Sequence, residues 1–106
     1  MLEHKPSDVF RAVADANRRK ILDLLLEEEQ PVQDIASHMS ITMGAISQHL
    51  KILRECGLVT REKRGRFRYY RIHPQQLRDI FDWTSKYSRF WISRLDNLGK
   101  YLDESS

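Results

Sequence analysis

Cysteine is almost absent from the sequence, since Cys56 is the single one among 106 residues. One cysteine excludes a disulfide within the chain and a metal site built from several thiolates. Scarce cysteine is typical of proteins that work in a reducing compartment. No apolar run approaches the ~20 residues that a membrane-spanning helix needs, and no charged-then-apolar leader opens the chain. We therefore expect a cytoplasmic protein without membrane insertion.

Residues that carry out chemistry are scarce as well. The sequence has no evident pairing of a nucleophile with a base and no glycine-rich phosphate loop. Its four histidines, His4, His38, His49 and His73, are scattered along the chain, whereas a transition-metal site needs three or four converging nitrogen or sulfur ligands. We expect no metal, no other cofactor and no enzymatic activity.

Positive charge, by contrast, is concentrated in one stretch. The formal net charge is only +3, but residues 51–71 alone carry +6, which leaves −3 for the remaining chain. The eight basic residues of this stretch are Lys51, Arg54, Arg61, Lys63, Arg64, Arg66, Arg68 and Arg71. Such a concentration predicts that this part of the protein meets a polyanion.

Residues 32–56 contain two short helical patterns joined by a tight turn, the arrangement of a helix-turn-helix. The first pattern places four apolar residues on one face: Val32, Ile35, Ala36 and Met39. Thr42 is the expected N-cap of the second helix, which should run to about Glu55. One face of that helix should pack on the body of the domain, through Ile46, His49, Leu50 and Leu53.

The other face of the second helix consists of small and hydrogen-bonding residues, Gly44, Ser47, Gln48 and Lys51. Short side chains permit close approach to a major groove, and glutamine can pair with adenine through two hydrogen bonds. The alternative is an ordinary solvated face. The basic stretch that follows favours the DNA-facing interpretation.

Two helices should precede this unit. The first begins at Pro6 or Ser7, and the second follows Asp15, its expected N-cap. The buried side of the second helix is predicted to be Ile21, Leu22, Leu25 and Leu26. Arg18 and Arg19 lie near its N-terminus, where the helix dipole disfavours cations. A neighbouring anion would account for them, and simple solvation is the alternative.

After the helix-turn-helix, residues 59–72 predict a two-stranded ribbon. Gly57 is the expected C-cap of the preceding helix, and Gly65 meets the need of a tight hairpin. Tyr70 and Ile72 should point inward, and the arginines near the turn should point outward. Because like charges destabilise a small hairpin unless a partner compensates them, we interpret this ribbon as a basic wing and not as a solvated hairpin.

Residues 75–102 predict one long C-terminal helix, with apolar residues spaced alternately by four and three. Such a helix would extend ~40 Å, more than a domain of this size covers. It therefore needs a second surface for Trp83, Trp91 and their neighbours, and another copy of the chain is the simplest source. The alternative is a helix that only completes the core of its own subunit.

Several of these segments together resemble the ArsR family of bacterial winged-helix repressors. They are residues 15–22 (DANRRKIL), 35–36 (IA), 47–53 (SQHLKIL), 57–59 (GLV) and 70–72 (YRI). The resemblance implies a single mainly α domain with a small β-hairpin, a winged helix-turn-helix. It also implies a homodimer through the first and last helices, which binds operator DNA.

The resemblance and the residue patterns together define the candidate sites. The expected DNA contacts are Thr42, Met43, Gly44, Ser47, Gln48, Lys51, Lys63, Arg64, Arg66 and Arg68. The expected dimer contacts are Val9, Phe10, Val13, Trp83, Tyr87, Phe90, Trp91, Leu95 and Leu98.

The chain departs from the metal-sensing members of that family. Some sense metals through a cysteine pair in the helix matching residues 32–39, where this chain has no cysteine. Others use Asp and His on paired C-terminal helices, and here that segment has no histidine. The sequence therefore resembles a metal-independent branch of autorepressors. Cys56 lies at a helix C-terminus, where the negative end of the helix dipole raises the pKa of a thiol. We therefore interpret Cys56 as a small half-buried residue and not as a redox switch.

Two functions from different classes follow. The first is a homodimeric repressor that binds an inverted repeat. The second is a winged-helix module whose aromatic C-terminal helix binds a different protein. A related variant keeps DNA binding and uses that helix or the wing for release, by sequestration on a partner protein.

Overall fold

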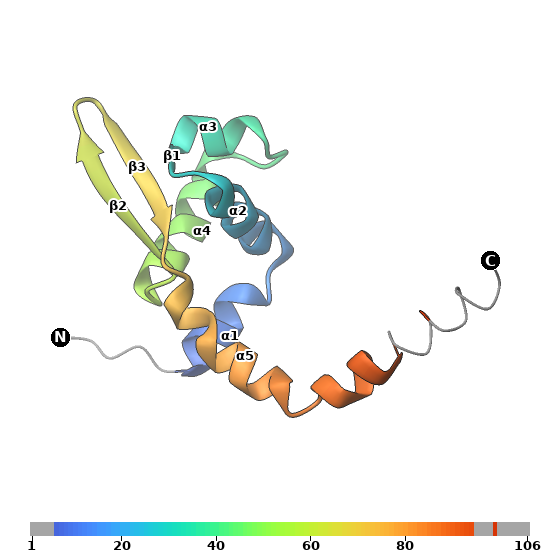
Figure 1. Cartoon of the computed structure of the whole chain (residues 1–106). Coiled ribbons are helices and arrows are strands. Elements are labelled where there is room, and N and C mark those ends of the chain that lie inside the picture. Colours follow the sequence, from blue (N-terminus) through green and yellow to red (C-terminus); the bar gives the residue numbers. More distant parts are fainter. Residues whose placement is uncertain (1–5, 95–98, 100–106) are drawn as a thin grey trace.

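The computed structural model describes residues 6–94 and residue 99. Its helices are α1 (Pro6–Val13), α2 (Ala16–Glu27), α3 (Val32–Ser37), α4 (Met43–Glu55) and α5 (Arg78–Ser85), with a 3-10 turn, η1 (Pro74–Leu77), ahead of α5. Its strands are β1 (Gln30–Pro31), β2 (Val59–Arg64) and β3 (Phe67–Ile72). The β2–β3 hairpin projects to one side of the helices, and α5 leads the chain away from them (Figure 1).

The helix boundaries at α2 and α4 confirm the predicted caps. The Asp15 carboxylate accepts hydrogen bonds from the backbone N–H groups of Asn17 (2.8 Å) and Arg18 (3.1 Å). Thr42 Oγ1 accepts one from the N–H of Ala45 at 3.1 Å. Each side chain thus satisfies donors that the first helical turn leaves without a partner.

The core lies where α1, α2, α3, α4 and the base of the hairpin meet. Its fully buried large side chains are Ile21, Ile35, Ile46, Leu50, Leu53, Leu58, Val9 and Val59. The prediction that Leu26 is buried was wrong, because this side chain is 68% exposed. At about 100° per residue the core-facing stripe is centred between Ile21 and Leu25, so Leu26 points past its edge.

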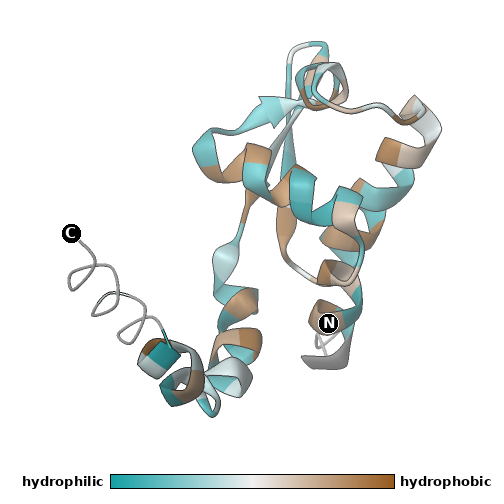
Figure 2. Cartoon of the chain, turned by 90° about the vertical axis from the view of Figure 1, so that its right-hand side faces the viewer, coloured by the Kyte–Doolittle hydropathy of each residue, from teal (hydrophilic) through white to brown (hydrophobic). Residues whose placement is uncertain are grey.

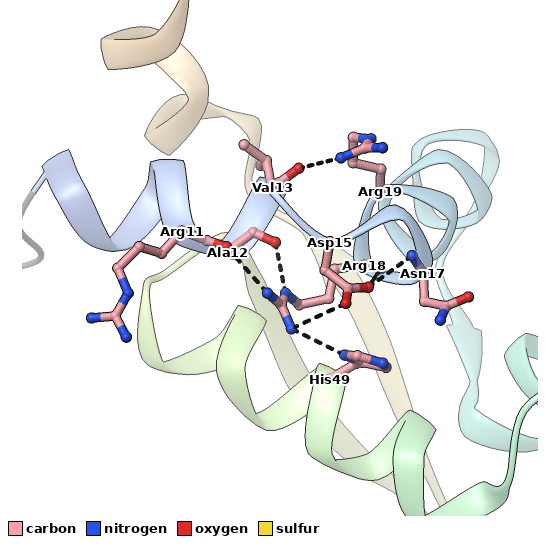
Figure 3. A network of polar contacts seen from close by, with 8 residues as sticks. All are labelled: Arg11, Ala12, Val13, Asp15, Asn17, Arg18, Arg19 and His49. Atoms are coloured by element: carbon pink, nitrogen blue, oxygen red, sulfur yellow. Dashed lines mark hydrogen bonds and ion pairs between the residues drawn. The ribbon is translucent and has the colours of Figure 1, made fainter.

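Arg18 and Arg19 owe their positions to α1 (Figure 3). The Arg18 guanidinium donates to the carbonyls of Ala12 (2.7 Å) and Arg11 (3.1 Å), and Arg19 donates to that of Val13 (2.8 Å). These carbonyls end α1, so the two cations complement the negative end of that helix dipole. The main partners of the two arginines are therefore neutral backbone carbonyls.

Arg18 also reaches α4, the second helix of the helix-turn-helix. Its Nη1 lies 3.2 Å from His49 Nδ1 and 4.0 Å from the Asp15 carboxylate (Figure 3). An arginine has donors only, so the Arg18 guanidinium donates this hydrogen bond and His49 Nδ1 accepts it. One side chain, only 14% exposed, thus joins α1, α2 and α4.

The hydrogen bonds at the α2 N-terminus lower the pKa of Asp15. The largest cause is the bond from the Arg18 N–H, and the pKa lies below its ordinary value of 3.8. A carboxylate whose folded-state pKa is lowered stabilises the fold above the unfolded-state value. This stabilisation is lost as the pH falls from 3.8 through the lower folded-state pKa.

We therefore expect Asp15→Asn to destabilise the protein at pH 7 and to have a diminishing effect in acid. Asparagine still accepts the capping hydrogen bonds but carries no charge. Urea unfolding of both proteins between pH 7 and pH 2.5 measures the difference in the free energy of unfolding. A difference that stays constant below pH 3.8 would contradict the assigned role of the charge.

The hairpin forms the wing and gains a third strand that the sequence did not predict. The sheet order is β1-β3-β2, and β1 pairs Gln30 with Tyr70. Strand β1 has only two residues, one of them proline, so the sequence shows no strand periodicity there. The C-cap of α4 is Cys56, and Gly57, predicted as the cap, lies one position beyond it in the expected left-handed conformation (φ 80°). Gly65 also has positive φ (62°), which confirms the predicted hairpin turn.

The single helix predicted for residues 75–102 is interrupted. After η1, α5 ends at Ser85, residues 86–87 form a turn, and helical structure resumes at 88–94. Figure 1 shows the change of direction at this turn. Residues 95–98 and 100–102 of the predicted helix lie outside the described residues.

Hydroxyl side chains explain this break. Thr84 Oγ1 donates to the carbonyl of Ile80 (2.9 Å), and Ser85 Oγ donates to that of Phe81 (2.6 Å). Such bonds compete with the helix ladder and bend it. The backbone N–H of Tyr87 then bonds three residues back, to Thr84 (2.9 Å). Local hydrogen bonding therefore overrides the apolar periodicity.

Candidate nucleic-acid interface

A hollow of about 500 Å³ separates α4 from the wing. Its lining residues are Val32, Gln33, Gly44, Ser47, Gln48, Lys51, Arg54, Arg61, Arg66, Phe67, Arg68 and Tyr70. Five of them are cations, and none of these lining residues is a carboxylate. The hollow is therefore a positively charged concave surface, shared by the recognition helix and the wing.

The polar stripe of α4 forms one wall of this hollow. Gly44, Ser47, Gln48 and Lys51 are all exposed and all line it. A Cβ built at Gly44 would meet nothing closer than Thr42 Oγ1, at 4.0 Å. The fold therefore does not require glycine at this position, and the missing side chain leaves room on the outer surface.

Thr42 and Met43 lie at the N-terminal end of α4 and are exposed, but neither lines the hollow. The Thr42 hydroxyl caps the helix as an acceptor, so its proton remains available to an external acceptor. Met43 is 48% exposed. Both side chains are thus accessible at the end of α4 that would enter a groove first.

The inner face of the wing forms the opposite wall. In the β2–β3 register Lys63 pairs with Arg68 and Arg61 pairs with Tyr70. Directly paired residues point to the same face of a sheet, and Tyr70, on this face, is buried against the body. Arg66 lines the hollow from the hairpin turn. Of the predicted wing contacts, Lys63, Arg66 and Arg68 therefore lie on the inner face or at the turn.

Arg64 does not lie on this face, contrary to the prediction. Arg64 pairs with Phe67 and directly follows Lys63 in β2. Because successive side chains of a strand point to opposite faces, Arg64 points to the outer face of the wing. There it donates to the carboxylates of Glu29 (2.5 Å) and Glu62 (3.1 Å). The Arg64 hydrogen bond lowers the pKa of Glu29, and the two carboxylates raise the pKa of Arg64.

Six of the twelve lining residues were not among the predicted DNA contacts, and three of these six are Arg54, Arg61 and Gln33. Arg54 lies three residues after Lys51 and therefore falls on the same face of α4. Arg61 lies two residues before Lys63 and therefore points to the same, inner face of the wing. Helix and strand periodicity would have identified both. Gln33 comes from α3, a placement that no local pattern indicates. The Nε of Arg54 is buried without a hydrogen-bond partner, which leaves a donor unsatisfied beside the hollow.

Predicted dimer contacts divide between the core and an exposed aromatic surface. Val9 is 1% exposed and packs within its own subunit, so its assignment to an interface was wrong. Phe10 and Val13 are half-buried, and the Phe10 ring packs edge-on against Trp83, with centroids 5.7 Å apart. Leu95 and Leu98 lie outside the described residues.

The aromatic surface itself continues along α5 and residues 88–94. Its exposed members include Phe81, Trp83, Tyr87, Phe90, Trp91 and Ile92. Figure 2 shows brown, hydrophobic bands along α5 and the helical segment after it. Large apolar side chains gathered in this way are typical of a protein-protein interface.

Other kinds of site find no support in the part of the chain that the structure describes. Within it, no three His, Cys, Asp or Glu residues are placed to hold a metal ion, and no helix is long and apolar enough to cross a membrane. Cys56 is buried, and burial raises the pKa of its thiol. A raised pKa disfavours the reactive thiolate.

Comparisons with known proteins agree with this geometry. A family model described as "Bacterial regulatory protein, arsR family" matches residues 15–61. The transcriptional repressor SdpR of Bacillus subtilis (strain 168) is 39% identical over 91 residues, which cover 86% of this chain and 97% of SdpR.

Solved structures give the same result. The crystal structure of a "possible transcriptional regulator for arsenical resistance" has a TM-score of 0.64 and 44% identity, over 83% of this chain and 88% of that one. The homodimeric winged helix-turn-helix DNA-binding domain of Mb0332 from Mycobacterium bovis has a TM-score of 0.65 and 28% identity, over 83% and 82% of the two chains. The chain therefore belongs to the ArsR family, and it is a winged helix-turn-helix DNA-binding transcriptional regulator.

Proposed function

We propose that this protein is a homodimeric repressor that binds an inverted-repeat operator through the hollow between α4 and the wing. The observation that carries the proposal is the composition of that hollow. Five cations and the base-reading candidates Ser47 and Gln48 line one concave surface. A surface of this kind offers phosphate contacts for affinity and hydrogen bonds to bases for specificity.

Each wall of the hollow has its own role in this proposal. The N-terminal half of α4 enters the major groove, where Gly44 permits close approach and Gln48 reads a base edge. The inner face of the wing follows the neighbouring phosphates through Arg66 and Arg68. Arg54 and Arg61, which also line the hollow, add to the phosphate contacts.

A dimer accounts for the aromatic surface of α5 and residues 88–94. Exposed side chains such as Phe90 (63%) and Trp91 (51%) gain a partner when two copies pair. Two-fold symmetry then places two recognition helices about one DNA turn apart. Repression and dimerisation are also supported by two similar proteins, SdpR, a transcriptional repressor, and the homodimeric Mb0332.

The two functional classes predict different results in one experiment. We propose that the purified protein selects, from genomic DNA of its source organism, fragments that share an inverted repeat. Its affinity for them should be about 10⁻⁸ to 10⁻¹¹ M at physiological salt. A monomer in light scattering, together with no salt-sensitive DNA binding, would instead favour a module that binds a different protein. Because the proposed partner is DNA, we propose that the protein acts in the cytoplasm. A sequestering partner protein would bind the C-terminal helix or the wing.

Gln48 is the residue whose loss should change specificity most selectively. We expect Gln48→Ala to relax the preference at one base pair per half-site, with a cost of ~1–3 kcal/mol on the preferred sequence. The affinity of the variant for random DNA should fall only slightly. The measurement is a binding titration against every single-base variant of the selected half-site. An equal loss on operator and random DNA would contradict base reading by Gln48.

A further inference from the structure

We propose that Arg64, Glu29 and Glu62 form a brace, here called the wing brace, that holds the outer half of the wing at a set angle to α4. Arg64 is then a positioning residue for DNA binding and makes no phosphate contact itself. The inference rests on the proposed function in one respect, namely that the wing meets DNA.

The Arg64 guanidinium makes two hydrogen bonds and one ring contact on the outer face of the wing. Its Nη1 lies 2.5 Å from Glu29 Oε1 and its Nη2 lies 3.1 Å from Glu62 Oε2. The guanidinium carbon lies 4.9 Å from the centre of the Tyr69 ring. Two carboxylates and an aromatic face thus hold one planar cation, an arrangement that favours arginine over lysine.

Glu29 is a suitable anchor because its backbone belongs to the body of the domain. The next residue, Gln30, is buried, pairs with Tyr70 in the sheet and donates from its side chain to the carbonyl of Leu24 at 3.0 Å. The other carboxylate oxygen of Glu29 lies 4.0 Å from Nε of Arg71, near the C-terminal end of β3. A bond to Glu29 therefore ties the wing to the end of α2.

The outer half of the wing needs such a tie. All side chains from Arg61 to Arg68 are exposed, and a two-stranded hairpin is only marginally stable by itself. Its inner face also gathers like charges, including those of Lys63 and Arg68, which pair directly and repel each other. Within this stretch, which the structure describes completely, Arg64 makes the one ion pair that leaves the hairpin.

The wing brace therefore sets the width of the hollow. The cations of the inner face lie opposite Lys51 and Gln48 of α4, so their spacing depends on the angle of the wing. An unbraced wing would have to be ordered when DNA binds, and this ordering weakens affinity without removing a phosphate contact. This consequence distinguishes a positioning residue from a phosphate-binding one.

The first test uses the full chain without DNA. We expect Glu29→Gln and Arg64→Ala each to accelerate backbone amide hydrogen exchange of residues 61–68 by about two- to five-fold, the effect of losing one partly exposed ion-pair network. Glu28→Gln is the matched control, because Glu28 is exposed in the same loop and its side chain makes none of the described ion pairs. Unchanged exchange in both brace variants overturns the proposal, whether or not the wing touches DNA.

The second test measures affinity against salt concentration on one duplex. We expect Arg64→Ala and Glu29→Gln each to weaken binding about two- to five-fold with the slope of log K against log salt unchanged. The loss in the double variant should be smaller than the sum of the two single losses, because both substitutions remove the Arg64–Glu29 ion pair. Arg66→Ala is the comparison, with a slope shallower by about one. If Arg64→Ala shows that same shallower slope and Glu29→Gln binds more tightly, Arg64 contacts phosphate and the brace is wrong.

Discussion

Replacing Trp91 with glutamate should convert the protein to a monomer and lower its affinity for a two-half-site operator by about 10²- to 10⁴-fold, the usual gain from linking two binding modules. Trp91 is 51% exposed on residues 88–94, beyond the turn that ends α5. Its replacement should therefore leave the core intact. A buried carboxylate in a subunit interface is costly unless it finds a partner.

The measurements for this variant are sedimentation equilibrium and operator titration. Trp91→Phe is the matched control, because it keeps an aromatic ring and should remain dimeric. A single half-site should be bound equally by the wild type and Trp91→Glu at protein concentrations where one subunit suffices. If Trp91→Glu stays dimeric and binds the full operator normally, the interface lies elsewhere.

Removing Arg66 and Arg68 together should give the largest change in salt dependence. Both side chains are exposed, both line the hollow, and neither has an ion pair among those described. Each is thus available to displace a counterion from DNA. We expect Arg66→Ala combined with Arg68→Ala to make the slope of log K against log salt shallower by about two, on operator and random duplex alike.

The control for the double wing variant removes two positive charges at a distance from the hollow. Arg78 and Lys86 are exposed on α5 and in the turn after it, and their replacement by alanine should leave the salt slope unchanged. An unaltered slope in the wing variant would show that the wing does not contact phosphate. Equal changes in both double variants would indicate only a general loss of positive charge.

The features that the sequence predicted well are those encoded by neighbouring residues. Asp15 and Thr42 cap their helices through donors two or three residues away, and α4 ends at Glu55, as its periodicity predicted. Gly65 forms the hairpin turn through its own backbone conformation. The candidate interface followed from the same patterns, because the stripe of α4 and the alternation of the wing each place residues on one face.

The features that the sequence did not predict depend on distant parts of the chain or on competing local bonds. Arg64 lies 35 residues from Glu29 in the sequence, so no periodicity could show that its charge is taken up there. In the C-terminal segment the cause is local instead. The hydroxyls of Thr84 and Ser85 bond to nearby carbonyls and interrupt the helix that the regular apolar repeat predicted.

The position of Arg18 has a mechanical consequence for the assembled regulator. Its guanidinium holds the last carbonyls of α1, which packs against the aromatic α5, and at the same time the imidazole on α4. A lysine has only one nitrogen and could not satisfy these directions together. In the proposed dimer, we therefore expect a rotation between subunits to change the orientation of α4 through this side chain, so that operator spacing and subunit geometry would be linked.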